Sequence, residues 1–248
     1  MTVVMIPIYK ETPSDMELAS LRQCVTVLGK YAMVLVCPEN MCVKNYVDHM
    51  SCDVSVMRFK SHYFKSIRGY SKLLLSPFFY EQFLAYEWML VYQLDAWVFK
   101  DALNHWCSQG YDYIGAPWFS QNTEGEGVLL EIAGNGGLSL RRIRAVLSVL
   151  KKPVRRSFVQ ILKEDPVWHY MTQYITCFWQ KTTLYEDSAL VRYGPVVDPH
   201  FLVAPPHVAM FFSFESQPKR LYEMTNRSLP FGCHAFQKHG DDFWKPIL

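Results

Sequence analysis

The sequence has few of the features that mark membrane-spanning, repetitive or multidomain proteins. No apolar run approaches the roughly 18 residues that a membrane span requires. No linker rich in Gly, Ser or Pro, internal repeat or low-complexity segment divides the 248 residues, so we expect one domain. A net charge of +2 gives no general signal for nucleic-acid binding. With 50% hydrophobic residues, the chain can bury one substantial core.

Paired cysteine motifs are also missing. Seven cysteines, an odd number, occur without a CxxC pair or regular spacing. This pattern is typical of small buried side chains in a reducing compartment, and it argues against a disulfide framework. The segment Met1–Tyr9 has no basic stretch and no cleavage site, so we expect no signal peptide. These features predict a soluble, cytoplasmic protein.

The first sixty residues contain alternating apolar runs and helical segments. Short buried strands are predicted over Val3–Ile8, Tyr31–Cys37 and Val54–Phe59. Helices are predicted from Ser14 to about Gly29 and near Cys42–Met50. This β-α-β-α-β order with short connections predicts a parallel sheet that is covered on both faces.

Ligands of such sheets bind at the carboxyl ends of the strands. Pro7, Tyr9 and Lys10 follow or end the first predicted strand, so we expect them at that edge.

A further strand is predicted over Met89–Phe99, after helical segments near Gly69–Ser76 and Pro77–Tyr86. Gln93 and Asp95 break its apolar character and would share one face, because strand side chains alternate. A carboxylate in so apolar a strand is costly to bury unless it is paired or solvated at a site. We therefore expect Asp95 to have a functional role, with a structural acid at a strand end as the alternative.

Three glycines in four positions, in Gly134-Asn135-Gly136-Gly137, are the most informative local feature. Glycine admits positive φ and lets a ligand approach the main chain, so the segment predicts a backbone-lined pocket. A tight turn before a helix is the alternative, since we expect a basic amphipathic helix over about Leu140–Leu150.

The remaining segments have weaker patterns. Tyr111–Trp118 predicts a strand and turn, and residues 119–130 predict a mobile loop over the site. Short strands and turns are expected over Pro195–Phe214. The tail from Leu229 to Pro246 has too many aromatic and basic residues for a disordered end.

Between Arg141 and Arg156 the chain has seven Lys or Arg residues and no acid. The pattern is typical of a solvated helix face. The alternative is a patch that meets anionic lipid headgroups or a phosphate-bearing acceptor, with peripheral contact at the inner face of the membrane.

Three motifs in order resemble the GT-A glycosyltransferases. They are the acid-bearing segment Tyr92–Phe99, the glycine turn of Gly134–Arg142, and Glu186-Asp187-Ser188. The glycine turn is close to the pattern Asn-Gly-Gly-(Leu/Phe)-(Ser/Phe)-Leu-Arg that is common in those enzymes.

Longer segments resemble a more specific family. Tyr92–Trp97, Tyr111–Trp118, the glycine turn and Phe231–Phe236 are similar to largely uncharacterised bacterial glycosyltransferases associated with surface polysaccharides. The similarity runs from about Val3 to Trp244. It implies a single GT-A-like α/β domain over residues 1–248, with a mixed, mostly parallel central sheet flanked by helices. Residues 1–100 would form a nucleotide-binding half, and residues 101–248 a donor-sugar and acceptor half with a closing C-terminal tail.

GT-A enzymes hold a divalent cation with an Asp-x-Asp element at a strand end. Here one carboxylate remains, because Asp95–Trp97 lacks the second acid and Gln93–Asp95 lacks the first. The resemblance implies that Asp95 and the C-terminal His234 hold Mn²⁺ or Mg²⁺. As an alternative, the diphosphate is neutralised without metal by Lys238, His239 and Lys245.

The resemblance also implies the other site residues. Asp187 would take the acceptor proton in an inverting transfer, with Glu186 as the alternative base. The expected nucleotide- and donor-binding residues are Pro7, Tyr9, Lys10, Arg68, Lys72, Gln93, Asp95, Ala96, Trp97, Asn135, Gly136, Gly137 and Lys238.

The implied function is a hexosyltransferase-like enzyme that moves a sugar from a nucleotide-sugar donor, a UDP-sugar, to a glycan or lipid-linked glycan. The incomplete acid pair supports one alternative, a non-catalytic sugar-nucleotide- or glycan-binding module derived from such an enzyme. A second alternative is a nucleotidyltransferase, which shares the sheet architecture. That class usually has a glycine- and basic-rich loop after its first strand, and Pro7–Thr12 is not such a loop.

Overall fold

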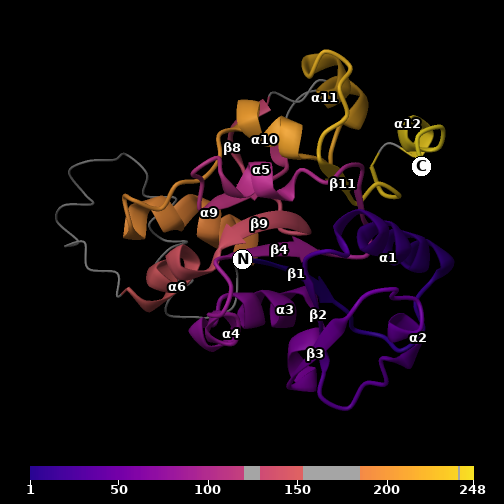
Figure 1. The fold of residues 1–248 in the computed structure, drawn as a ribbon. Helices are drawn as coiled ribbons and strands as arrows, with labels where there is room; N and C mark the ends of the chain where they lie inside the picture. Colours follow the sequence, from indigo (N-terminus) through magenta and orange to yellow (C-terminus); the bar gives the residue numbers. More distant parts are fainter. Residues whose placement is uncertain (120–128, 153–184, 240) are drawn as a thin grey trace.

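A six-stranded sheet of order β3-β2-β1-β4-β9-β6 forms the centre of the protein (Figure 1). The computed structural model describes residues 1–119, 129–152, 185–239 and 241–248. Strands β1 to β4 run parallel, and β9 lies antiparallel between β4 and β6. The strands are β1 Thr2–Pro7, β2 Ala32–Pro38, β3 Val54–Phe59, β4 Trp88–Tyr92, β6 Tyr113–Gly115 and β9 Leu138–Arg142.

Helices cover both faces of this sheet, as the β-α-β-α-β pattern predicts. Side chains alternate along β1, so Val4 and Ile6 pack in one hydrophobic cluster with residues of α1 and α5, whereas Val3 and Met5 pack in another with residues of α3, α4, α6 and α9. The helices are α1 Asp15–Leu28, α2 Lys44–Val47, α3 Ile67–Leu74, α4 Pro77–Glu81, α5 Leu103–Cys107, α6 Ile143–Lys151 and α9 Glu186–Val197.

Local signals fix the first helix. The Ser14 hydroxyl accepts a hydrogen bond from the Glu17 amide, and the Glu17 carboxylate accepts one from the Ser14 amide at 2.6 Å. This capping box satisfies main-chain donors that an isolated helix start leaves unpaired. The predicted helix from Ser14 to about Gly29 is therefore confirmed.

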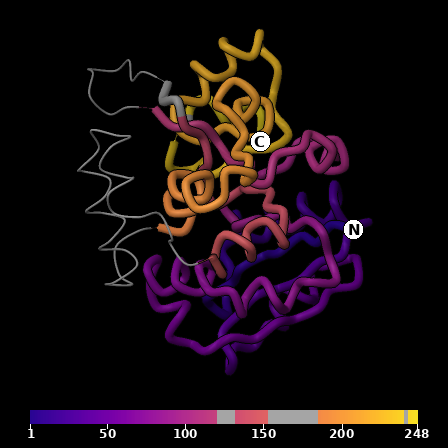
Figure 2. The backbone as a smooth tube through the Cα atoms, turned by 90° about the vertical axis from the view of Figure 1, so that its left-hand side faces the viewer, coloured from indigo at the N-terminus to yellow at the C-terminus, as the bar shows by residue number. Residues whose placement is uncertain are grey.

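The strand order reverses between β1 and β4. From β1 the chain builds outward through β2 and β3, then returns to place β4 on the other side of β1. A crevice forms at the carboxyl ends of the strands at such a reversal, and ligands of open α/β sheets bind there. Figure 2 shows the first hundred residues, indigo to purple, lying beside the orange and yellow C-terminal segments.

A smaller sheet, β10-β11-β5, joins the C-terminal tail to the residues that follow β4. In this sheet β11 runs antiparallel to β5 and parallel to β10. The tail also contributes Trp244, which is 2% exposed and stacks on Phe99 with ring centroids 5.8 Å apart. The tail is thus a packed part of the fold. The additional elements are β5 Ala96–Val98, β7 Pro117–Phe119, β8 Leu129–Ala133, α10 Pro206–Phe212, β10 Ser213–Phe214, α11 Pro218–Met224, β11 Gly232–His234 and α12 Asp241–Trp244.

Two predictions about local structure near the site are wrong. Met89–Phe99 is not one strand, because β4 ends at Tyr92 and a turn closed by a hydrogen bond from the Ala96 amide to the Gln93 carbonyl precedes β5. The glycine segment leads into strand β9 and not directly into a helix. Helix α6 begins only at Ile143, after β9 has paired with both β4 and β6.

Two further predictions concern the second half. The prediction of short strands and turns over Pro195–Phe214 is correct only in part: the last two residues form β10, but the stretch also contains the end of α9 and the helix α10. The predicted loop over residues 119–130 begins in β7 and ends in β8, and its residues 120–128 lie outside the described residues.

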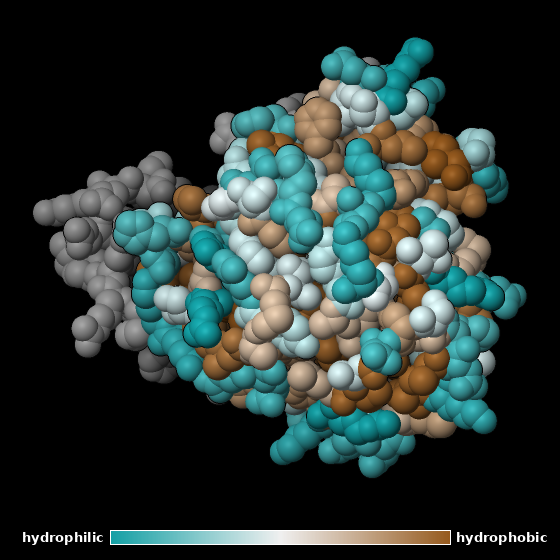
Figure 3. Space-filling model, viewed as in Figure 1, coloured by the Kyte–Doolittle hydropathy of each residue, from teal (hydrophilic) through white to brown (hydrophobic). Residues whose placement is uncertain are grey.

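The basic segment is mostly paired where the structure describes it. Arg141 is buried, and Arg142, Lys151 and Lys152 form ion pairs with Glu87, Glu81 and Asp198 respectively. This pairing argues against a free cationic face for a membrane; Arg155 and Arg156 lie outside the described residues. On the face seen in Figure 3, hydrophobic residues form several separate groups among hydrophilic ones. Within the described residues, no helix combines the length and apolar character needed to cross a bilayer.

Candidate active site

The turn after β4 brings Gln93 and Asp95 to the carboxyl edge of the sheet. The Gln93 amide donates a hydrogen bond to the Gly137 carbonyl at 2.9 Å, which ties this turn to the glycine segment. Asp95 has a side chain that is 47% exposed. The prediction that both residues share one face of a strand is wrong about the strand, because a turn presents them, but both side chains contact His234.

His234 lies against this turn because β11 pairs with β5. The register places His234 opposite Ala96, immediately after Asp95. Its Nε2 is 3.1 Å from Asp95 Oδ1 and 3.3 Å from Gln93 Oε1, and its Nδ1 is 3.3 Å from Glu215 Oε1. Burial opposes the charged form of the ring, but hydrogen bonds and charge from Asp95 and Glu215 outweigh it and raise the pKa of His234 to about 9.

The same contact affects the partner carboxylate. Burial opposes ionisation of Asp95, but its hydrogen bond to His234 lowers the pKa of Asp95, and the positive charge of Lys238 contributes to the decrease. Asp95, His234 and Lys238, all predicted site residues, are thus electrostatically coupled.

The glycine turn packs directly on His234. A Cβ atom added at Gly137 would lie 1.9 Å from His234 Nε2, so only glycine fits beside the ring. The Gly137 amide donates to Asn135 Oδ1 at 2.9 Å, and Asn135 Nδ2 donates to Glu215 at 2.7 Å. Close approach of the main chain explains the glycine at position 137.

On its other side, the turn meets the first residues of α9. A Cβ atom at Gly136 would lie 2.7 Å from Glu186 Oε1 and 3.2 Å from the Asp187 Cβ. The Gly136 amide donates to Asp187 Oδ2 at 3.2 Å. Glu186 and Asp187 occupy the first turn of α9, where the helix dipole favours acidic groups.

The two acids have different surroundings. Glu186 is 5% exposed, and both of its oxygens have protein partners: Oε1 accepts from Arg141 at 3.3 Å and Oε2 from Ser71 at 2.9 Å. Arg141 is fully buried and also donates to the Ser139 and Tyr80 hydroxyls at 3.0 and 3.1 Å. This arrangement holds Glu186 as a buried ion-pair partner.

Asp187 has a weaker set of compensating contacts. Its oxygens accept from the Ser188 and Gly136 amides, and Arg141 helps to stabilise its charge. Burial and the nearby charge of Glu186 outweigh these effects and raise the pKa of Asp187 to about 6. A carboxylate with such a pKa is suited to exchange protons near neutral pH.

The other predicted donor-binding residues lie around this cluster or on the same edge. Pro7 ends β1, Tyr9 is 64% exposed, and Lys10 forms an ion pair with Glu17 at 2.7 Å. Arg68 and Lys72 are exposed on α3, the helix whose Ser71 contacts Glu186. Their contact with a nucleotide remains a prediction.

Ala96 and Trp97 have supporting positions. The buried Ala96 carbonyl accepts hydrogen bonds from the Ser20 hydroxyl at 2.6 Å and the Tyr92 hydroxyl at 3.0 Å. Trp97 packs edge-on against Phe236, with ring centroids 6.1 Å apart. Both residues connect the site turn to the core and the tail.

The site has a small set of donor atoms that could bind a divalent cation. Within the described residues, no group of three or more His, Cys, Asp or Glu side chains is placed to hold a metal. His234 Nε2, Asp95 Oδ1 and Gln93 Oε1 nevertheless converge, and nitrogen with carboxylate and amide oxygens forms a donor set compatible with Mn²⁺. The protein residues fit a cation whose remaining ligands come from a diphosphate or water.

Three site residues were not predicted as such from the sequence. Glu215 contacts His234 and Asn135, Arg141 contacts Glu186, and Ser71 contacts Glu186. Arg141 is the last residue of the Asn-Gly-Gly-(Leu/Phe)-(Ser/Phe)-Leu-Arg pattern, but it also begins the basic run, whose pattern is typical of a solvated helix face. Glu215 and Ser71 have no local motif, so the sequence carried no signal for them.

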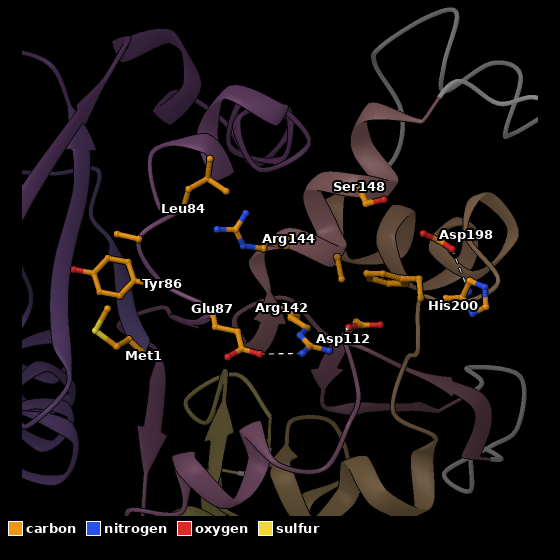
Figure 4. A pocket seen from close by; sticks show the side chains of 13 residues that line it. Met1, Leu84, Tyr86, Glu87, Asp112, Arg142, Arg144, Ser148, Asp198 and His200 are labelled. Atoms are coloured by element: carbon orange, nitrogen blue, oxygen red, sulfur yellow. Dashed lines mark hydrogen bonds and ion pairs between the residues drawn. The ribbon is translucent and has the colours of Figure 1, made fainter.

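A cavity of about 630 Å³ lies at the opposite edge of the sheet. It is lined by residues that precede the parallel strands, including Met1, Glu87 and Asp112. Figure 4 shows Arg142 joined to Glu87, and Arg142 also lies 3.7 Å from Asp112. The charged groups of this cavity largely neutralise one another. The cavity lies away from the cluster of acids and glycines.

Solved structures share this fold. Mouse xyloside xylosyltransferase 1 in its apo form aligns with a TM-score of 0.52 and 12% identity, over 94% of this chain and 97% of that chain. The galactosyltransferase LgtC, in complex with donor and acceptor sugar analogues, aligns with a TM-score of 0.51 and 11% identity, over 94% and 86%. The protein therefore has the GT-A glycosyltransferase fold, a mixed and mostly parallel sheet flanked by helices.

The chain belongs to the family described as "Protein of unknown function (DUF5672)", whose model matches residues 53–234. The matched range includes the glycine turn, both acids of α9, Glu215 and His234. No curated protein matches the sequence.

Proposed function

We propose that the protein is a glycosyltransferase that moves a sugar from a nucleotide-sugar donor, a UDP-sugar, to a glycan or lipid-linked glycan. The observation that carries this proposal is the meeting of Asp95, His234 and the Gly136–Gly137 turn at the edge where the strand order reverses. The glycosyltransferase fold supports it. The association with bacterial surface polysaccharides and a cytoplasmic location remain predictions.

In this proposal the donor lies along the carboxyl edge. The loop after β1, with Pro7, Tyr9 and Lys10, and the exposed Arg68 and Lys72 of α3 bind the nucleotide. All of these residues lie within residues 1–100, the predicted nucleotide-binding half. Lys72, exposed on α3, offers charge to phosphate oxygens, which Lys binds as a point charge, and Lys10 would do so in place of its ion pair with Glu17.

The diphosphate lies beside Asp95 and His234 in this proposal. Asp95 and His234, with Gln93, would hold Mn²⁺ or Mg²⁺; when bound, the cation supplies positive charge that stabilises the leaving diphosphate. Lys238 adds charge at the same place. The buried Gly136 and Gly137 would back the donor sugar from behind, and Asn135 fixes the turn through its bond with Gly137.

Asp187 is the proposed base. Both Glu186 oxygens are engaged by Arg141 and Ser71, whereas the burial and charge environment of Asp187 raise its pKa to about 6. Asp187 would accept the proton of the acceptor hydroxyl as that oxygen attacks the anomeric carbon from the face opposite the leaving group. The result is inversion at that carbon.

The alternative function is a sugar-nucleotide-binding module without catalysis. Gln93 in place of a second acid favours it, because an amide oxygen carries no charge and binds a cation more weakly than a carboxylate. Binding without turnover would distinguish this module from the enzyme.

Transfer and binding of the donor test the proposal together. We expect wild-type protein to bind UDP-sugars in calorimetry, to release UDP slowly in Mn²⁺-containing buffer, and to transfer the sugar when glycan acceptors are added. Asp95→Asn should lose donor affinity and activity. The matched control is Asp112→Asn, at the opposite edge of the sheet, which should retain both.

Donor binding by wild type with neither hydrolysis nor transfer would support the binding module instead. Wild-type affinity and activity in Asp95→Asn would refute the proposed site.

A further inference from the structure

Glu215 is a partly buried acid that contacts both the histidine and the glycine turn. Its side chain is 14% exposed. The same oxygen, Oε1, lies 3.3 Å from His234 Nδ1 and accepts a hydrogen bond from Asn135 Nδ2 at 2.7 Å. Neither a helix terminus nor an ion pair with Lys or Arg accounts for its position among the described contacts.

Strand pairing explains how Glu215 reaches this position. Strand β10 runs parallel to β11, with Phe214 opposite Cys233. The next residues in the chain are Glu215, immediately after β10, and His234, the last residue of β11. Two residues separated by nineteen positions are therefore neighbours because of a main-chain register, which places the carboxylate beside the ring.

The contacts of Glu215 complete a closed ring of hydrogen bonds. Asn135 joins Glu215 to the Gly137 amide, and the Gly137 carbonyl accepts from the Gln93 amide. Gln93 Oε1 then lies 3.3 Å from His234 Nε2, and His234 returns to Glu215. This closed set of hydrogen bonds links the turn after β4, the glycine turn and the β10–β11 pair.

We propose that Glu215 is a positioning residue that holds the His234 ring with Nδ1–H toward itself and Nε2 toward Asp95. A carboxylate oxygen accepts hydrogen bonds, so Nδ1 donates to Glu215 as Nε2 donates to Asp95, and Nε2 would give up its hydrogen to bind a cation. The other nitrogen, Nε2, is therefore the one presented to the proposed diphosphate site. The role of Nε2 at the diphosphate site rests on the proposed function. The orientation of the imidazole ring does not depend on that function.

The arrangement has a physical parallel in metal sites. A histidine that binds a metal usually donates its second ring N–H to a carboxylate, which fixes the ring and makes the ligand more basic. Glu215 would serve His234 in this way if a cation is held there. Loss of such a partner typically weakens metal affinity about 10–100-fold.

The variants Glu215→Gln and Glu215→Ala test this role. Gln preserves the shape and removes the charge, which keeps the test usable if Ala fails to fold. The matched control is Glu87→Gln, which removes an acid paired with a cation at the opposite edge of the sheet. Far-ultraviolet circular dichroism first establishes that each variant is folded.

Nitrogen-15 NMR of histidine-labelled protein provides a readout that does not depend on catalysis. The His234 signals are assigned by their loss in His234→Gln. We expect a hydrogen-bonded, slowly exchanging Nδ1–H in wild type and in Glu87→Gln. It should weaken in Glu215→Gln and exchange rapidly in Glu215→Ala. An unchanged His234 Nδ1–H signal in folded Glu215→Ala would overturn the proposal.

Titration with Mn²⁺ alone provides the second readout. The expected result is an affinity about 10–100-fold lower in Glu215→Ala than in wild type, and unchanged in Glu87→Gln. Equal Mn²⁺ affinity in wild type and Glu215→Ala would overturn the positioning role at a bound cation. If wild type binds no Mn²⁺, the cation in the proposed function is refuted, while the NMR result still decides the role of Glu215.

Discussion

In Asp187→Asn, kcat for sugar transfer should be about 10²–10⁴-fold lower than in wild type, while the affinity for the donor stays close to wild type. The amide has the size of the carboxylate but cannot accept the proton of the acceptor hydroxyl. Steady-state kinetics gives kcat, and calorimetry gives the dissociation constant of the donor. The matched control is Asp198→Asn, the same chemical change at the other end of α9, where Asp198 pairs with Lys152.

The pH dependence of the rate adds a second signature. Asp187 works as a base only when it is deprotonated, and burial and Glu186 raise its pKa to about 6. Turnover by wild type should therefore fall as the pH decreases through about 6, and this acidic limb should be absent in Asp187→Asn. Near-normal turnover in Asp187→Asn would remove the base role from this residue, and retained configuration in the product would contradict inversion.

Arg141→Met should lower the free energy of unfolding by about 3–5 kcal/mol. Arg141 is fully buried, and its loss leaves the buried Glu186 carboxylate without its cation and the Tyr80 and Ser139 hydroxyls without a donor. Chemical denaturation followed by circular dichroism measures the change. Methionine fills much of the space, so the loss reports mainly on the charge and hydrogen bonds.

A double variant separates the ion pair from packing. Arg141→Met with Glu186→Gln removes both charges, and we expect it to be more stable than Arg141→Met alone. The charge of Arg141 also lowers the pKa of Asp187, so any residual activity of the single variant should have its acidic limb at a higher pH. Wild-type stability in Arg141→Met would contradict the role assigned to this buried pair.

The first half of the fold could be predicted because its signals are local. Continuous apolar runs gave β1, β2 and β3, and the pair Ser14 and Glu17 gave the start of α1. The acid pair at the start of α9 is likewise a local signal. Each depends on residues within one or two helical turns, which a sequence pattern can represent.

The break between β4 and β5 depends on distant contacts. Leu94, Ala96 and Val98 are buried, so the apolar pattern continues across the turn as it would along one strand. The hydrogen bond from Gln93 to Gly137 and the pairing of β5 with β11 create the break. Neither can be inferred from the residues next to the turn.

Arg141 and Glu215 illustrate the limit for site residues. Arg141 stands in a run of basic residues, and only the ladder between β4, β9 and β6 turns it into the core beside Glu186. Glu215 is an isolated acid whose importance follows from the β10–β11 register. By contrast, a lone acid in an apolar segment indicates Asp95, three glycines in four positions indicate the glycine turn, and the family resemblance indicates His234. The structure brings the three together.

A crystal structure of the protein with UDP and Mn²⁺ tests the central proposal most directly. We expect the diphosphate beside Asp95 and His234 at the carboxyl edge, the uracil near the loop after β1, and the space for a sugar beside, and not between, the contacting glycine turn and Asp187. Nucleotide bound instead in the cavity lined by Arg142 and Arg144, with the Asp95–His234 site free of it, would contradict the proposed donor site.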